Sequence, residues 1–168
     1  MDAKNLQINY MTKEYAHLIS KWKYDGIYSL YNNSIDMLDS FMDGNHFACI
    51  NKSSELIGYY CFGEDARIPA IEDNVFNNEF IDIGLGMNPM LCGNGFGASF
   101  LKAGLQYAYS LYGSSKFRLS VVHFNERAIN VYKRLGFCTQ KEVTHLHSGE
   151  KFYVMTLIYN KCGTCAKS

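Results

Sequence analysis

The sequence predicts a mixed α/β domain of the α+β type, with a largely antiparallel sheet of about six to seven strands flanked by helices. The order of segments is one reason, because it runs strand, helices, several strands, helix, strand, helix and two strands. The length of 168 residues is another, since it suits one domain with its own core. A third reason is that the glycine-rich turn lies past the midpoint of the chain. A doubly wound dinucleotide fold carries such a turn near the N-terminus, so this position argues against that fold.

The N-terminal part is expected to contain one strand and several helices. Residues 6–11 are predicted to form the strand, and Thr12 follows as a helix N-cap. The helix is predicted to run to about Lys23, because one helical face is apolar and aromatic: Tyr15, Leu18, Ile19 and Trp22. Residues 25–42 are expected to form one or two further short helices.

The middle of the chain is predicted to hold two strands followed by a long loop. Residues 46–51 and 55–62 have the composition of strands, and a polar turn joins them. The irregular segment 63–78 contains Pro69 and several acidic residues. A long loop in a compact domain is often functional, so this segment is a candidate part of a binding surface.

The C-terminal half is predicted to alternate strands with helices and to end in a hairpin. Strands are expected at residues 80–87, 116–122, 137–143 and 151–158, and helices at residues 96–112 and 125–135. The hairpin turn is expected at Ser148 and Gly149. One domain is expected over residues 1–160, with residues 161–168 as a C-terminal tail.

The composition excludes several classes of function. The formal net charge is zero, which leaves no basic footprint for nucleic acid and none for an anionic membrane. No apolar run is long enough to span a bilayer, and the first residues lack the apolar core of a signal peptide. We therefore expect a soluble cytoplasmic protein without nucleic-acid or membrane partners.

The six cysteines are expected to be reduced thiols, because disulfides are rare without a secretory signal. Cys49 and Cys61 lie in strand-like segments, where cysteine often acts as a small buried hydrophobe. The close pair Cys162 and Cys165 offers at most two metal ligands, whereas a structural zinc site needs four. No metal site is expected, and a redox or metal protein built on this pair is the alternative.

The strongest functional signal is the glycine-rich stretch that joins the predicted strand at residues 80–87 to the next helix. Its glycines alternate with other residues at Gly93, Gly95 and Gly97. Without Cβ atoms the backbone can curl tightly, and another molecule can approach its N–H groups. The helix aims its unpaired N–H groups and the positive end of its dipole at the same place. A phosphate-bearing ligand suits such a turn, and a merely connecting turn is the alternative.

A second pattern covers the helix predicted at residues 125–135. Asn125 is a good N-cap, and Phe124 and Ile129 are placed as a hydrophobic staple. Gly136 is placed to end the helix in the left-handed conformation. One face of this helix carries Ala128, Val131, Tyr132 and Leu135.

Together these two patterns resemble the GNAT superfamily of acetyl-CoA-dependent N-acetyltransferases. That family carries a pyrophosphate loop of the form Arg/Gln-x-x-Gly-x-Gly/Ala, and residues 92–97 read Cys-Gly-Asn-Gly-Phe-Gly. Its next motif often reads Asn-x-x-Ala-x-x-x-Tyr-x-x-x-Gly-Phe. The named positions of that motif are filled here by Asn125, Ala128, Tyr132, Gly136 and Phe137. The resemblance implies a GNAT-like fold over the whole chain.

The resemblance further implies an enzyme that transfers an acetyl group from acetyl-CoA, used as a co-substrate and without a metal, to an amine. Backbone N–H groups of the loop would bind the pyrophosphate, and the end of the preceding strand would bind the pantetheine arm. The implied coenzyme-binding residues are Leu85, Gly86, Met87, Gly93, Asn94, Gly95, Phe96, Gly97, Ala98 and Asn125.

The resemblance also implies a catalytic role for Tyr132 as the donor of a proton to the departing thiolate. A phenol with a pKa near 10 can protonate a thiolate whose thiol has a pKa of about 8.5 if the site is tuned. Simple packing of Tyr132 on its helix is the alternative. Candidates for the general base are Glu79 and Asp82, at the strand that precedes the glycine-rich stretch. His123 is a further candidate, since histidine titrates near neutral pH. Release of the proton to water is the remaining route.

The chain departs from the family pattern at two positions. Cys92 replaces the Arg or Gln that opens the loop, and a nearby helix N-terminus can activate a thiol, so we hypothesise that Cys92 is the most reactive cysteine. The motif style is nearest to the ribosomal-protein N-terminal-alanine acetyltransferases, which carry a glutamate where this chain has Ser120.

The identity of the acceptor therefore stays open. A protein N-terminus or lysine is one class, and a small amine such as a polyamine or an aminoglycoside is the other. A binding module of a different class, an acyl-CoA sensor without turnover, is a further alternative. A monomer or homodimer is expected.

Overall fold

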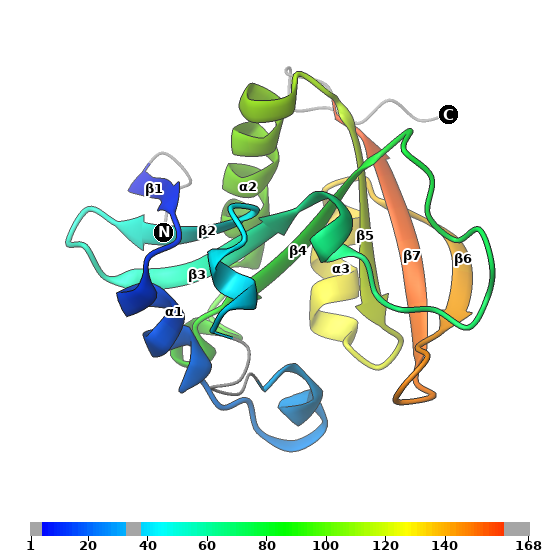
Figure 1. Cartoon of the computed structure of the whole chain (residues 1–168), viewed down its shortest axis with the longest axis horizontal. Helices are drawn as coiled ribbons and strands as arrows, with labels where there is room; N and C mark the ends of the chain where they lie inside the picture. Colours follow the sequence, from blue (N-terminus) through cyan, green and yellow to red (C-terminus); the bar gives the residue numbers. More distant parts are fainter. Residues whose placement is uncertain (1–4, 33–37, 160–168) are drawn as a thin grey trace. The chain divides into compact units, whose positions relative to one another are not determined.

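A computed structural model describes residues 5–32 and 38–159, and Figure 1 shows the course of the chain. The chain forms two compact units, of which the first is Met1–Cys61 with Leu85–Gly104 and the second is Phe62–Gly84 with Leu105–Ser168. Within the described residues seven strands form a mixed sheet in the order β1-β2-β3-β4-β5-β7-β6. The expected mixed α/β architecture is confirmed.

The first unit begins with an antiparallel sheet and one helix. Its elements are β1 (Leu6–Tyr10), α1 (Lys13–Ser20), β2 (His46–Asn51) and most of β3 (Leu56–Phe62). Strand β2 pairs antiparallel with both β1 and β3. Thr12 caps α1 as predicted, because its Oγ1 accepts a hydrogen bond of 3.2 Å from the Tyr15 N–H. The helix ends at Ser20, earlier than the predicted Lys23.

In the described part of residues 25–42, two short 3₁₀ helices follow α1, in agreement with the short helices expected there. They are η2 (Gly26–Tyr31) and η4 (Ser40–Met42), and residues 33–37 lie outside the described part of the chain. Phe41 of η4 is buried with residues of α1 and β2 in one apolar cluster. The buried members of this cluster are Met11, Ala16, Ile19, Phe41 and Ala48.

The first half of α2 (Gly97–Tyr112) packs closely on β3 in the first unit. The Tyr60 and Phe100 rings stack with centroids 4.6 Å apart, and the Tyr60 hydroxyl donates a hydrogen bond of 2.7 Å to the Phe100 carbonyl. A Cβ added at Gly104 would lie 2.5 Å from the Tyr60 ring, so this close approach needs a glycine. These contacts hold the N-terminal half of α2, and hence the loop before it, against the strand.

The second unit contains the other sheet strands and the last helix. Its elements are the start of β4 (Ile81–Met87), the end of α2, β5 (Lys116–Val122), α3 (Glu126–Arg134), β6 (Cys138–Thr144) and β7 (Lys151–Ile158). Strand β7 lies between β5 and β6 and is antiparallel to both, as Figure 1 shows. Strand β4 pairs in parallel with β5 through Ile81↔Phe117 and Asp82↔Arg118, which is the single parallel crossover that was expected.

The long loop expected at residues 63–78 is attached to the region around the end of β6 through residues near its middle. It starts with the 3₁₀ helix η5 (Gly63–Ala66), and Ala70 forms an isolated bridge with His145. The Glu72 carboxylate accepts hydrogen bonds of 2.8 and 2.9 Å from the backbone N–H and the hydroxyl of Thr144. The middle of the loop therefore lies along the end of β6, on the exposed surface.

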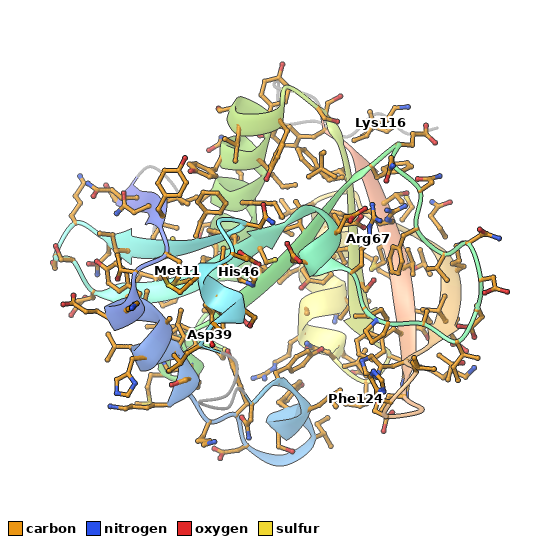
Figure 2. The ribbon with its side chains drawn as sticks, in the orientation of Figure 1. Met11, Asp39, His46, Arg67, Lys116 and Phe124 are labelled. Carbon is orange, nitrogen blue, oxygen red and sulfur yellow. The ribbon has the colours of Figure 1, made fainter. Side chains whose placement is uncertain are left out.

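A buried cluster of charges lies at the start of β4. Asp82 and Arg118 are only 2% and 3% exposed. Arg118 donates two hydrogen bonds of 2.6 and 2.7 Å to the Asp82 carboxylate, and Arg67 donates a third of 2.8 Å. Figure 2 labels Arg67 on the loop that leaves η5. Because the loop and two strands meet on one carboxylate, Asp82 is the anchor of this part of the unit.

Among the described residues, no helix has the length and hydropathy needed to cross a bilayer. The expected tail at residues 161–168 and its pair Cys162 and Cys165 lie outside the described part.

The two carboxylates near the start of β4 are expected to differ strongly in their effect on stability. Asp82→Asn should lower the free energy of unfolding by about 3–5 kcal/mol, because it leaves the buried Arg118 guanidinium without its counter-charge and removes one of the two carboxylates that pair with Arg67. Glu79→Gln is the matched control: Glu79 pairs with Lys116 at 2.7 Å but is 54% exposed. Glu79→Gln should lower the free energy of unfolding by less than about 1 kcal/mol. Denaturant unfolding of both variants measures this difference, and equal losses would contradict the anchoring role.

Candidate functional site

Asn88 ends strand β4 and ties it to β3 in the first unit. Its backbone N–H donates a hydrogen bond of 2.8 Å to the Ile57 carbonyl, and its side-chain amide donates one of 3.3 Å to the Leu56 carbonyl. The side-chain oxygen of Asn88 accepts a hydrogen bond of 3.0 Å from the Met90 N–H. One residue therefore fixes the end of the strand and caps the turn that follows.

The turn that follows is a short 3₁₀ helix, η6 (Pro89–Leu91), which the sequence reasoning treated as part of the loop. Proline suits its first position because the ring presets φ and the missing N–H has no partner in a helix start. Gly93 and Gly95 then adopt φ values of +81° and +80°, the left-handed region that glycine enters at little cost. A Cβ at Gly95 would meet nothing within 4 Å, so its outer side is open.

Helix α2 begins directly after these glycines, at Gly97. The Phe96 carbonyl accepts hydrogen bonds of 2.9 Å from both the Phe100 N–H and the Ser99 hydroxyl, which closes the first turn. The first N–H groups of any α-helix lack partners within the helix and carry its positive dipole end. The loop and the helix start together form a backbone surface suited to an anionic group.

The Cys92 thiol is directed back towards the end of β4. Its Sγ lies 3.6 Å from the Asn88 carbonyl oxygen and 3.8 Å from the Met87 carbonyl oxygen. Cys92 thus takes part in the turn itself as a weak donor. Its greater reactivity among the cysteines stays a hypothesis.

The carbonyl of Met87 points away from β3. The backbone N–H of Asn88 bonds to β3, and the Gly86 carbonyl lies against Gly58 of β3. Since backbone groups alternate along a strand, Leu85 and Met87 present theirs on the other edge of β4. The sequence implied contact with a pantetheine arm for Leu85, Gly86 and Met87, and of these three only Gly86 directs its backbone carbonyl towards β3.

Tyr24 reaches this edge from the segment before η2. Its hydroxyl donates a hydrogen bond of 2.8 Å to the Met87 carbonyl oxygen. Burial, and then the neighbouring Tyr59 and Cys92, raise the pKa of the Tyr24 phenol far above its usual value. The Tyr24 hydroxyl therefore keeps its proton and acts as a hydrogen-bond donor. No motif marks Tyr24 in the sequence.

Aromatic rings pack beside Gly86, the residue that precedes Met87 in β4. The Tyr59 ring lies against Gly86, where any Cβ would collide with it, so Gly86 permits a close approach of ring and strand. Trp22 lies 6.2 Å from Tyr59 between ring centroids. A cavity of about 440 Å³ opens beside them, with Leu18, Lys21, Trp22, Glu55, Leu56, Ile57, Asn88 and Leu91 as its lining.

The helix of the second sequence pattern, α3, belongs to the second unit. Asn125 is its N-cap, because its side-chain oxygen accepts a hydrogen bond of 3.3 Å from the Ala128 N–H. Tyr132 is 9% exposed, and its ring centroid lies 6.0 Å from that of Phe137. The Phe137 N–H donates to the Tyr132 carbonyl at 3.0 Å, so Phe137 ends the helix turn and β6 begins one residue later than predicted.

The candidate bases also lie in the second unit, in different surroundings. Both oxygens of Asp82 accept hydrogen bonds from guanidinium groups, whereas the Glu79 carboxylate is exposed and pairs with Lys116. The His123 Nδ1 lies 3.2 Å from the Lys151 carbonyl oxygen on the exposed surface. Among the described residues, no group of three or more His, Cys, Asp or Glu side chains could hold a metal ion.

Comparison with known proteins points to one family. The profile of the acetyltransferase (GNAT) family matches residues 11–137, which include the glycine loop and α3. No protein with a curated description matches the chain.

Solved structures of acetyltransferases share the fold. The structure of a GNAT-family acetyltransferase from Bacillus anthracis superposes with a TM-score of 0.70 at 14% identity, covering 92% of this chain and 95% of that one. A dodecameric spermidine N-acetyltransferase from Vibrio cholerae superposes with a TM-score of 0.66 at 17% identity, covering 95% and 96%. A chimera of that Vibrio enzyme gives 0.69 at 15% identity, covering 92% and 95%.

The strand end, the paired left-handed glycines and the helix start lie within the part of the chain that the family profile matches. The chain therefore belongs to the acetyltransferase (GNAT) family and is an acyltransferase of the N-acetyltransferase type.

Proposed function

We propose that this enzyme transfers an acetyl group from acetyl-CoA to a primary amine by direct attack of the amine on the thioester. The observation that carries the proposal is the pair Gly93 and Gly95, both left-handed, between the end of β4 and the start of α2. Such a backbone surface suits the pyrophosphate of a coenzyme, and it needs no basic side chain.

The coenzyme is proposed to bind through main-chain groups. The residues of the loop from Gly93 to Ala98 would donate N–H groups to the pyrophosphate, and Asn125 would add a side-chain contact. Leu85 and Met87 would hold the pantetheine arm through their backbone groups along the edge of β4 that faces away from β3, with Gly86 between them. A backbone N–H beside the thioester carbonyl would stabilise the charge that develops on its oxygen, and losing such a donor typically costs about 3–4 kcal/mol of activation free energy.

Tyr132 is the proposed proton donor to the departing thiolate. Support comes from the family motif, and from the position of Tyr132 on a well-capped helix whose ends are both hydrogen-bonded. A residue held in this way keeps its orientation, which general acid catalysis requires.

Glu79 and Asp82 are the proposed candidates for the base. Glu79 is the more favourable of the two, since it is exposed and an exposed carboxylate can exchange protons with water. Asp82 would first have to release two guanidinium groups. Direct loss of the amine proton to water is the alternative route.

A small amine is the acceptor class that the comparisons favour. Several structural neighbours are described as spermidine N-acetyltransferases, which supports a polyamine-like acceptor. A protein N-terminus is the second candidate, although Ser120 stands where the N-terminal-alanine branch carries its glutamate. Light scattering tests the expected monomer or homodimer.

Removal of the open glycine in the loop should weaken coenzyme binding. Gly95→Ala places a methyl group on the open side of the loop and strains a residue with φ of +80°, so the affinity for CoA should fall at least about tenfold. Gly149→Ala is the matched control, because Gly149 has φ of +71° and equally open surroundings in the β6–β7 turn. Isothermal titration calorimetry measures both affinities. Equal affinities would place the coenzyme elsewhere.

Turnover should depend on the Tyr132 hydroxyl. Tyr132→Phe is expected to reduce kcat about 100-fold or more, as the loss of a general acid does, with little change in CoA affinity. Tyr109→Phe on α2 serves as a control for the loss of a phenol. Release of free thiol from acetyl-CoA measures the rate, and wild-type turnover by Tyr132→Phe would show that another group supplies the proton.

A panel of amines should separate the acceptor classes. Thiol release from acetyl-CoA is expected with polyamines, and slower or no release with aminoglycosides and with peptides that begin with alanine. A protein that CoA stabilises by about 2.7 kcal/mol at 100 times its Kd, yet that releases thiol with no amine, would be a sensor instead of an enzyme.

A further inference from the structure

Two donor groups lie near the Met87 carbonyl oxygen. The Tyr24 hydroxyl lies 2.8 Å from it, and the Cys92 Sγ lies 3.8 Å from it. A carbonyl oxygen has two lone pairs, and the Tyr24 hydroxyl at 2.8 Å takes one of them. An arm that runs along this edge of β4 and bonds to Met87 therefore competes with the Tyr24 hydroxyl for this oxygen.

The phenol is the stronger and nearer of the two donors. A hydroxyl at 2.8 Å forms a full hydrogen bond, whereas a thiol at 3.8 Å is a weak donor. Tyr24 comes from a segment 63 residues away in sequence, while Cys92 is held inside the turn by its own N–H, which bonds to the Pro89 carbonyl. Displacement of Tyr24 thus clears the edge without unfolding the loop.

Tyr24 is linked to η2. Its backbone N–H donates a hydrogen bond of 2.6 Å to the Asn32 side-chain oxygen, and its ring meets that of Tyr31 edge-on with centroids 6.3 Å apart. Helix η2 itself contains no buried residue, and its Ile27 is 58% exposed. An element with so little burial can shift at low free-energy cost.

We propose that in the free enzyme the Tyr24 hydroxyl bonds to the Met87 carbonyl and so links η2 to the end of β4, a contact that we call the latch. The pantetheine arm displaces this hydroxyl from Met87 and so releases η2. This inference rests on the proposed function, because it requires the coenzyme arm to lie along the end of β4. The hydroxyl competes with the coenzyme for one acceptor. Wild-type enzyme must therefore bind coenzyme more weakly than a variant that lacks this hydroxyl.

Calorimetric titration of two ligands tests the competition. Tyr24→Phe keeps the ring and removes only the competing donor, so its affinity for CoA should rise about fivefold, equivalent to about 1 kcal/mol. Its affinity for 3′-phosphoadenosine 5′-diphosphate, which keeps the pyrophosphate and lacks the pantetheine arm, should not change. Tyr10→Phe, at a tyrosine that is 70% exposed on β1, is the control and should match wild type for both ligands.

The outcomes separate this inference from the proposed function. If wild-type protein bound neither CoA nor the nucleotide, the coenzyme site itself would be refuted. If both bound and Tyr24→Phe bound CoA no more tightly than wild type, only the latch would be refuted. Tighter CoA binding by Cys92→Ala instead of Tyr24→Phe would name the thiol as the competing donor and would also overturn the latch.

Hydrogen–deuterium exchange on the wild-type enzyme provides a second test that needs no variant. Saturating CoA should increase exchange at the backbone amides of residues 24–31, because the latch that holds them is released. The nucleotide 3′-phosphoadenosine 5′-diphosphate should leave their exchange unchanged. Protection of these amides by CoA would contradict the proposal.

Discussion

The attachment of Asn88 to β3 is the constraint on which the candidate site depends. Through its backbone and its side chain, Asn88 binds two successive carbonyls of β3 and caps η6. The strand must therefore stop at Met87, and the chain must turn before it can enter α2. The two left-handed glycines then connect the turn to the helix, which itself packs on β3 through Tyr60 and Phe100. Both ends of the loop are thus held by the same strand.

The alternation of backbone groups along β4 extends this constraint to Tyr24. With Gly86 and Asn88 facing β3, the Met87 carbonyl faces the other edge and is available to a donor from elsewhere. The Tyr24 hydroxyl takes that position in the first unit. The contact between β4 and the segment that contains Tyr24 therefore depends on how backbone groups alternate along β4. It requires no particular side chain on β4.

The proposed recognition of the coenzyme through main-chain groups is compatible with the low sequence identity among proteins of this fold. The solved acetyltransferases superpose over more than 90% of this chain at 14–17% identity. A phosphate bound by N–H groups constrains backbone conformation and leaves most side chains free to vary. Acceptor recognition depends instead on side chains presented by loops, so the family defines the reaction and leaves the amine to be found by experiment.

Local signals in the sequence determined much of the fold and part of the site. Thr12 and Asn125 were predicted as helix caps, and both accept the expected hydrogen bonds, because capping involves residues within one turn. The glycine-rich turn was predicted for the same reason, because the left-handed conformation that it uses is adopted by Gly93 and Gly95 themselves.

Only the tertiary structure decided which distant groups meet. Asp82 was predicted as a possible base from its strand alone, yet its environment is set by Arg118, 36 residues away, and by Arg67. No pattern in the sequence predicted the role of Tyr24, because its partner is a backbone carbonyl 63 residues away. Every residue has such a carbonyl, so the sequence does not mark which one Tyr24 will contact. Periodicity and capping are properties of neighbours in sequence, whereas these contacts arise when separate elements pack together.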